Sequence, residues 1–255
     1  MKRLFGLITF VALLGAAAPL SAQYTPAGGG GSSDIRFGFQ LSPSFSWMST
    51  NETLINSNGT NLGLKLGMIA EFYFRENYAF TTGLGFHFNA GGTLYYEGSF
   101  DEVNIWTEVD DLDARAFPGE TDFKYSLQFV EIPLGLKLRT REFGYLRYYM
   151  QPALHLGITT QSRGQIENVS GVDSEEKYDI SSAVNPINLG WGFGAGVEYN
   201  VSSSTSLVGG LAFQSGFADL TKDKNTRLVR PGRMDREDDS KGKINSITLV
   251  LGVMF

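Results

Sequence analysis

The chain of 255 residues contains no cysteine, only two histidines and eight prolines, and just 19% of its residues are charged. Without cysteine there can be no disulfide framework, no catalytic thiol and no thiolate metal site. The formal net charge of −6 argues against nucleic acid as a partner, because nucleic acids are bound by Lys and Arg on their phosphates. These absences exclude disulfide-stabilised exported proteins, thiol enzymes and thiolate metalloproteins, and they argue against a nucleic-acid-binding protein.

Long apolar runs are also missing after residue 22, and none reaches the ~18 residues that a membrane-spanning helix needs. The first residues, MKRLFGLITFVALLGAAAPLSAQ, combine a basic start, an apolar stretch and a small-residue site that ends at Ala22. This combination is typical of a secretory signal peptide. We therefore expect residues 1–22 to be removed after Ala22, and residues 23–33 to form a Gly/Ser-rich periplasmic tether.

From residue 34 to residue 255, apolar residues recur at every second position, which is the period of a β-strand. The alternating segments are approximately 35–48, 62–74, 78–96, 124–140, 144–160, 187–200, 205–217 and 244–255. Short connections alternate with long polar ones, which lie near 49–61, 97–123, 161–186 and 218–243. This layout predicts an all-β fold, an eight-stranded antiparallel up-and-down transmembrane β-barrel with short periplasmic turns and long extracellular loops.

The distribution of charge between the two faces favours the membrane over a soluble barrel. In segment 244–255, for example, Ile247, Leu249 and Leu251 alternate with small or polar residues, and no segment carries a charge on its apolar face. A Lys or Arg that faces lipid at mid-depth costs about 2–4 kcal/mol, whereas a soluble barrel would carry many charges outside. We therefore predict a monomeric barrel in the cell outer membrane, surrounded by lipid and lipopolysaccharide.

The stretch GWGFGAGVEY, residues 190–199, has glycine at four alternate positions. It formally matches both the dinucleotide-binding pattern G-x-G-x-x-G/A and the helix-packing pattern G-x-x-x-G. No helix pattern follows Ala195 and no apolar 20-mer surrounds the stretch, so both matches lack their structural context. The remaining interpretation is a strand with its glycines toward the lumen and its aromatic residues toward lipid.

Aromatic residues are expected to form one girdle at each membrane interface. The girdle near the short turns would contain Phe72, Phe74, Tyr78, Phe80, Phe143, Tyr145, Tyr148, Tyr199 and Phe255, and the girdle near the long loops Trp47, Phe86, Phe88, Tyr125, Trp191 and Phe213. Within segment 124–140, the apolar phase changes after Phe129. A one-residue slip exchanges the two faces, so we predict a β-bulge near Phe129–Val130.

Charged residues of both signs fall on the predicted lumen face. They are Arg36, Lys65, Glu71, Glu131, Lys137, Arg147 and Glu198. We interpret them as a structural cluster of ion pairs, and we predict no catalytic, cofactor or metal site. His87 and His155 also face the lumen, without a nucleophile at a recognisable spacing. Two alternatives stay open: an outer-membrane lipid-modifying enzyme that uses a lumen histidine, and a narrow ion or small-solute channel.

Two of the long loops are rich in charge. Loop 97–123 is acidic, which makes calcium binding one interpretation, but its stretch Asp110-Asp111-Leu112-Asp113 lacks the loop glycine and the terminal glutamate of an EF-hand. Loop 218–243 carries both signs, with Arg227, Arg230, Arg233 and Arg236 at intervals of three. Contact with lipopolysaccharide phosphates or with a partner protein is one interpretation of this loop; a solvated loop without regular structure is another, and solvation is also our interpretation of loop 97–123.

Two adjacent segments, FVEIPLGLKL at 129–138 and YYMQPALHLG at 148–157, resemble the PorT-like family of outer-membrane β-barrel proteins. That family has a recurrent strand pattern, which is matched here by Val130, Glu131, Ile132, Pro133, Leu134, Leu136 and Lys137. The resemblance implies a non-enzymatic structural or accessory role, linked to type IX protein secretion, with secretion or envelope proteins as partners. No catalytic residue carries over, because the family pattern contains none.

Overall fold

The computed structural model describes residues 35–112, 115–222, 226–232, 236–237 and 239–255. The expected signal peptide at 1–22 and the expected tether at 23–33 lie outside these residues, as do Asp113 of the acidic loop and Arg233. Among the described residues, no helix has the length and apolar character required to cross a membrane.

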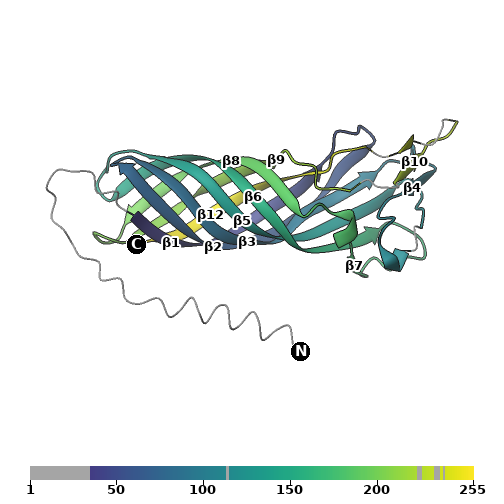
Figure 1. Cartoon of the computed structure of the whole chain (residues 1–255), viewed down its shortest axis with the longest axis horizontal. Helices are drawn as coiled ribbons and strands as arrows, with labels where there is room; N and C mark the ends of the chain where they lie inside the picture. Colours follow the sequence, from purple (N-terminus) through teal and green to yellow (C-terminus); the bar gives the residue numbers. More distant parts are fainter. Residues whose placement is uncertain (1–34, 113–114, 223–225, 233–235, 238) are drawn as a thin grey trace, which may run out of the picture. The chain divides into compact units, whose positions relative to one another are not determined.

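Eight long strands form a closed antiparallel ring, as predicted (Figure 1). Each strand pairs with the next long strand along the chain, and the pairing of the first with the last closes the ring. The strands are β1 (Ile35–Ser49), β2 (Ile55–Arg75), β3 (Tyr78–Tyr96), β5 (Thr121–Arg139), β6 (Leu146–Glu167), β8 (Ile187–Asn200), β9 (Ser206–Gly216) and β12 (Lys243–Met254). A closed ring leaves no open sheet edge toward lipid, which a membrane requires of a β-structure.

Short turns join the strands at the end of the barrel where the chain terminates, and long connections lie at the other end (Figure 1). The strands β2, β3, β5 and β6 continue beyond the rest at the long-loop end. Strand β6, for example, runs to Glu167, well past Ile158, where its pairing with β8 ends. Parts of the connections predicted at 49–61 and 161–186 are therefore strand.

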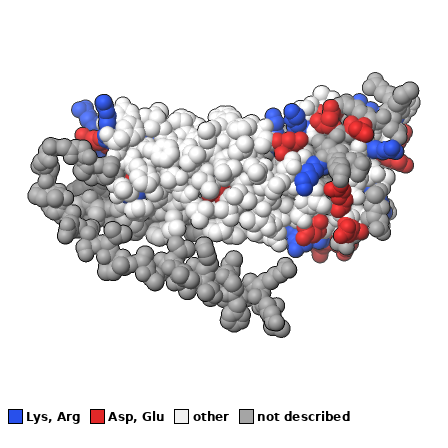
Figure 2. Space-filling model, in the orientation of Figure 1, with Lys and Arg blue, Asp and Glu red and all other residues white. Residues whose placement is uncertain are grey.

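The outer surface of the barrel is apolar, as the alternation predicts. Large side chains on the predicted lipid face are exposed, among them Phe37, Leu62, Leu211 and Leu251 at 45–64%. Figure 2 shows charged residues gathered at the two ends, with the middle of the visible face almost free of them. Such an apolar band between two polar ends is the surface that a bilayer core requires.

Most of the predicted aromatic girdles lie on this outer surface. Phe74 and Tyr145 at the periplasmic end are 59% and 67% exposed, and Phe86 and Trp191 at the other end are 45% and 47% exposed. Tyr125 is an exception, because its ring is 3% exposed and points into the barrel. Its assignment to a girdle is wrong.

The predicted β-bulge exists, but its extra residues belong to the neighbouring strands. In the pairing of β5 with β6, the register shifts between Gln128 and Phe129 of β5. In the pairing of β3 with β5, it shifts between His87 and Ala90 of β3. Strand β5 itself keeps one phase throughout. The side chains of β5 on both sides of the shift face the interior, namely Phe123, Tyr125, Leu127, Phe129, Glu131 and Lys137, all at most 7% exposed. The change of apolar phase reflects an interior that becomes apolar at one end.

That apolar interior belongs to a folded structure, here called the extracellular cap. It is made of residues 97–112, 115–120, 168–186, 218–222, 226–232, 236–237 and 239–242, with the adjoining ends of β2, β3, β5 and β6. Its short elements are β4 (Glu102–Asn104), η1 (Asp110–Leu112), β7 (Tyr178–Asp179), η2 (Ser181–Ala183), β10 (Arg227–Val229) and β11 (Arg236–Glu237). Strands β4, β10 and β11 form a small sheet. The long loops therefore contain regular structure, contrary to a solvated, irregular interpretation.

The core of the cap is aromatic. Phe123 is fully buried, and its ring meets Trp106, Tyr96 and Phe117 edge to face at centroid distances of 5.1, 5.2 and 5.5 Å. The Trp106 indole N–H donates a hydrogen bond to the Tyr125 hydroxyl over 3.0 Å. Offset and edge-to-face pairs of this kind add stability beyond the area they bury. The extracellular end of the barrel is thus filled by packed side chains.

A candidate functional site in the barrel lumen

On the lumen face of GWGFGAGVEY, the four glycines before Glu198 leave space that is occupied by rings from β6. A Cβ added at Gly192 would lie 2.8 Å from Nε2 of His155, and one added at Gly196 would lie 2.8 Å from Cε1 of Tyr149. On β9, a Cβ at Gly210 would lie 2.7 Å from the Tyr149 hydroxyl oxygen. The predicted lumen orientation of the strand β8 glycines is confirmed, and their role is to make room for these rings.

Two neighbouring glycines of β9 allow a matched test of this wall. We expect Gly210→Ala to destabilise the barrel by about 1–3 kcal/mol, because the new methyl group would overlap both Tyr149 and the backbone of Gly196. Gly209→Ala should leave stability unchanged or raise it slightly, since nothing lies within 4 Å of the added Cβ. Urea unfolding from lipid vesicles measures both; equal losses would contradict this account.

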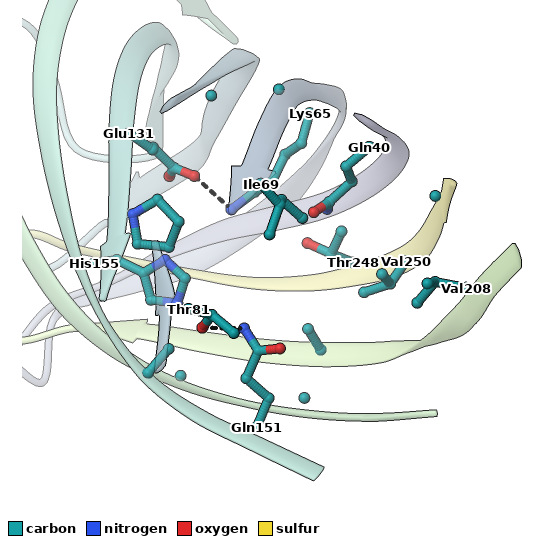
Figure 3. Close-up of a pocket in the computed structure, with 18 of the residues that line it drawn as sticks. Gln40, Lys65, Ile69, Thr81, Glu131, Gln151, His155, Val208, Thr248 and Val250 are labelled. Carbon is teal, nitrogen blue, oxygen red and sulfur yellow. Dashed lines mark hydrogen bonds and ion pairs between the residues drawn. The ribbon is translucent and has the colours of Figure 1, made fainter. Parts of the chain in front are cut away.

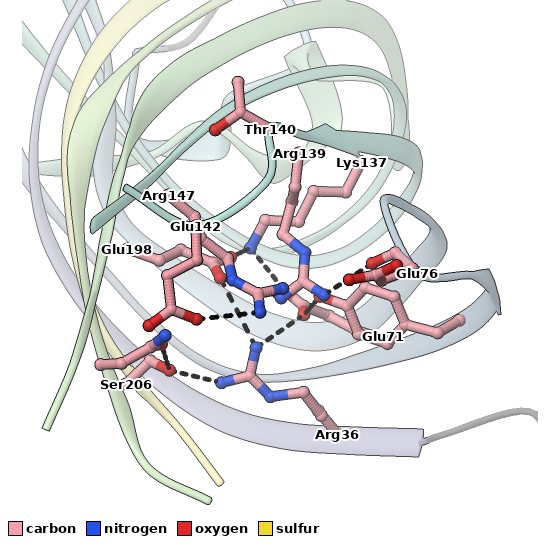
Figure 4. Close-up of polar contacts among 12 residues, drawn as sticks. Arg36, Glu71, Glu76, Lys137, Arg139, Thr140, Glu142, Arg147, Glu198 and Ser206 are labelled. Atoms are coloured by element: carbon pink, nitrogen blue, oxygen red, sulfur yellow. Dashed lines mark hydrogen bonds and ion pairs between the residues drawn. The ribbon is translucent and has the colours of Figure 1, made fainter. Parts of the chain in front are cut away.

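Five side chains near the short turns form what we call the periplasmic ion cluster, consisting of Arg36, Glu71, Lys137, Arg139 and Glu198 (Figure 4). The Glu198 carboxylate is fully buried; it contacts Lys137 and lies 3.1 Å from Arg139 and 3.5 Å from Arg36. Glu71 accepts hydrogen bonds from Lys137 over 2.6 Å and from the Tyr73 hydroxyl over 2.5 Å. Register explains the meeting, since Arg36 of β1 is directly opposite Glu71 of β2.

Arg147 was also predicted as a lumen charge, but its salt bridge lies outside the periplasmic ion cluster. It donates a hydrogen bond to Glu142 in the β5–β6 turn over 3.1 Å, and this bond holds the pKa of the Glu142 carboxyl below its usual range. Arg139, by contrast, belongs to the cluster but was not among the lumen charges predicted from the sequence. Its position two residues after Lys137 on the same strand was a sufficient signal, because the alternation places both side chains on one face.

A second group, here called the central polar cluster, contains Ser44, Lys65, His87, Glu131 and Gln214. The Lys65 ammonium group donates hydrogen bonds to the Glu131 carboxylate over 2.9 Å and to the side-chain oxygen Oε1 of Gln214 over 2.6 Å. His87 lies between Ser44 and Glu131, with Nε2 2.9 Å from the serine hydroxyl and Nδ1 3.3 Å from the carboxylate. Apart from Arg147, the predicted lumen charges thus form two groups at different depths.

A cavity of about 150 Å³ is lined by residues of both clusters; Figure 3 shows Lys65 and Glu131 at its edge. Lys65 and Glu131 line one part of it, and Glu71 and Lys137 line another. Other lining residues are Gln40, Ile69, Thr81, Gln151, His155, Val208, Thr248 and Val250. In the described part of the chain, no group of three or more His, Cys, Asp or Glu side chains is arranged to hold a metal ion.

Ser44, His87 and Glu131 have the order of a nucleophile, a base and a carboxylate that orients the base. The sequence could not reveal this arrangement, because the three residues come from three strands. Accessibility argues against catalysis, however. Ser44 and His87 are 0% and 2% exposed, and a Cβ at Gly63 would lie 2.8 Å from the serine Oγ. The geometry therefore supports a buried hydrogen-bonded chain rather than a substrate-accessible site.

Comparison with known proteins agrees with this architecture. Residues 21–222 match the model of the outer membrane protein beta-barrel domain. No curated protein sequence matches the chain. Similar solved structures include Neisserial surface protein A (14% identity, TM-score 0.45, 89% of this chain and 98% of that one), OprG from Pseudomonas aeruginosa (10%, 0.43, 88% and 98%) and Ail of Yersinia pestis (13%, 0.35, 88% and 99%).

Proposed function

We propose that this chain, which belongs to the family of the outer membrane protein beta-barrel domain, is a non-enzymatic accessory component of the outer membrane that acts through the surface of its extracellular cap. The observation that carries the proposal is the buried core of the cap. Loops that pack around Phe123 and Trp106 hold their exposed residues in fixed positions, which a binding surface requires.

The proposal includes the finer hypothesis of a PorT-like role in protein secretion. Its support is the strand pattern shared with that family, in which Glu131 and Lys137 are two of the matched residues. In this chain both residues form lumen ion pairs. The pattern thus serves the barrel interior, so the secretory role has to be tested through partners rather than through the motif.

A cross-linked pull-down from intact outer membranes, read by mass spectrometry, tests the proposal. We expect an amine-reactive cross-linker to recover a defined envelope or secretion protein in stoichiometric amount. The exposed cap residues Lys177 and Lys241 provide a matched control, because their replacement by arginine keeps the charge and removes the reactive amine. Loss of the product in that variant would place the partner at the cap; recovery of the barrel alone would contradict an accessory role.

The enzyme alternative has a direct test at Ser44. We expect no covalent labelling of the folded protein by a fluorophosphonate probe, because the hydroxyl is buried against Gly63. The denatured protein serves as a blank, and Ser44→Ala as the specificity control. Labelling of the folded protein that disappears in Ser44→Ala would show an accessible activated serine and would support the enzyme alternative.

The channel alternative concerns conduction through the lumen. We expect planar-bilayer recordings to be silent, because the cap core fills one end of the barrel and the periplasmic ion cluster crosses the other. An eight-stranded barrel is only wide enough to be filled by its own side chains. Stable single-channel steps that change with substitution of Lys65 would instead demonstrate a conducting path.

A further inference from the structure

The mid-barrel cavity has the size and the lining of a small-molecule site. Its volume of about 150 Å³ equals that of apolar protein cavities that hold a benzene molecule. It lies inside the ring of strands, between the periplasmic ion cluster and the central polar cluster. Side chains from β1, β2, β3, β5, β6, β9 and β12 line it.

Polar groups without a hydrogen-bond partner in the described part of the chain point into this cavity (Figure 3). Among the described residues, the side chains of Gln40, His155 and Thr248 show no hydrogen bond to another residue, although all three line the cavity. Gln151 donates its amide to Thr81 over 3.2 Å, which leaves its carbonyl oxygen free. Buried polar groups are costly unless a partner satisfies them, so a molecule in the cavity that offers both a donor and an acceptor is stabilised there.

The charged groups of the lining, in contrast, already have partners. Lys65 is paired with Glu131 at 2.9 Å, and Lys137 is paired with Glu71 at 2.6 Å. Each pair contributes one positive and one negative charge, so the lining offers no uncompensated charge to an ion. An ion that entered would lose its hydration without gaining a counter-charge.

Apolar side chains complete the lining. Ile69, Val208 and Val250 border the same space as the amides and the imidazole (Figure 3). We propose that the mid-barrel cavity is a binding site for an uncharged molecule of a few heavy atoms that has a hydrogen-bond donor, an acceptor and an apolar part. Gln40, Gln151, His155 and Thr248 bind its polar groups, and the three aliphatic side chains bind its apolar part.

Three molecules of the same shape test the proposal: acetamide, acetate and acetamidinium, which carry charges of zero, −1 and +1. The full-length barrel, with isotope-labelled His and Gln side chains, is refolded into detergent micelles in the presence of each, so that entry does not limit binding. We expect acetamide to shift the His155 imidazole and Gln40 amide signals saturably. Acetate and acetamidinium should bind at least about tenfold more weakly, which corresponds to about 1.4 kcal/mol.

Two adjacent positions on β9 give a matched pair of variants. Val208→Phe fills the cavity and should abolish the saturable shift, whereas Leu207→Phe changes the lipid face and should leave it intact. Gln40→Leu keeps the size of the side chain and should weaken acetamide binding even if Val208→Phe fails to fold. Linear shifts would show a cavity that holds water alone, and saturation that survives both lumen variants would place the acetamide site outside the cavity; either result would overturn the proposal. Equal binding of either ion would overturn the neutral ligand class.

Discussion

Glu198→Gln is expected to destabilise the folded barrel by about 3–5 kcal/mol, because removal of one partner from a buried ion pair leaves the other charges uncompensated. The substitution keeps the size of the side chain and removes one of the two negative charges of the periplasmic ion cluster. Arg36 and Lys137 would then keep only Glu71 as a carboxylate partner, and Arg139 would lose its salt bridge to Glu198. Urea unfolding from lipid vesicles and the heat-dependent gel shift both measure the loss.

Glu142→Gln is the matched control for this prediction. It also removes a carboxylate bound to an arginine, but it does so in an exposed turn, where solvent screens the charge. We expect a change near the limit of measurement. A loss as large as that of Glu198→Gln would show that burial does not decide the effect.

A double variant separates the charge balance of the cluster from the packing of Glu198. Combining Glu198→Gln with Arg139→Gln removes one charge of each sign from a single contact, so we expect the pair to be more stable than the sum of the two single changes. Additive losses would mean that the two groups do not interact and that the cluster is not the unit of stability.

Phe123→Ala is expected to unfold the extracellular cap while the barrel stays folded. Truncation of a buried phenylalanine costs about 3–5 kcal/mol, and here it would remove the ring that meets Trp106, Tyr96 and Phe117. Limited proteolysis should cut within the cap, and the near-ultraviolet circular dichroism of Trp106 should fall. The heat-dependent gel shift should persist, because the strand pairing inside the membrane is unchanged.

Phe86→Ala is the comparison for the cap prediction, since this ring lies on β3 as a lipid-facing residue with 45% exposure. It should leave the cap resistant to protease. If Phe123→Ala also left the cap resistant, the loops would owe their structure to something other than this core. If it abolished the gel shift as well, the cap and the barrel would unfold as one unit.

The residues of β5 show where sequence reasoning stops. The alternation on each side of Phe129 is confirmed, but the slip inferred from the change of phase does not exchange the faces of β5, which keeps one phase throughout. The side chains of Leu134 and Leu136 face outward toward lipid, whereas those of Tyr125 and Leu127 face the core of the cap. A periodic pattern is the same in both cases, because it reports burial against something apolar and not the identity of that environment.

The lumen charges show the same limit in another form. The alternation places Glu71, Glu131 and Glu198 on the interior face, yet their partners depend on the depth at which each strand is aligned with its neighbours. The registers of successive strands set Arg36 opposite Glu71, and Lys65 opposite His87, and the alternation within one strand does not fix these registers. Ring closure then brings Gln214 of β9 to Lys65 of β2, a contact that no local spacing encodes.

The period of two, the charge-free apolar face and the alternation of short and long connections are local properties, so they are enough to predict a membrane barrel of eight strands. The orientation of the β8 glycines can be predicted in the same way, because the apolar rings that alternate with them, such as Trp191 and Phe193, face lipid. The two polar clusters, the cavity between them and the folded cap could not be predicted in this way. Each depends on contacts between residues far apart in the chain, which register and ring closure bring together.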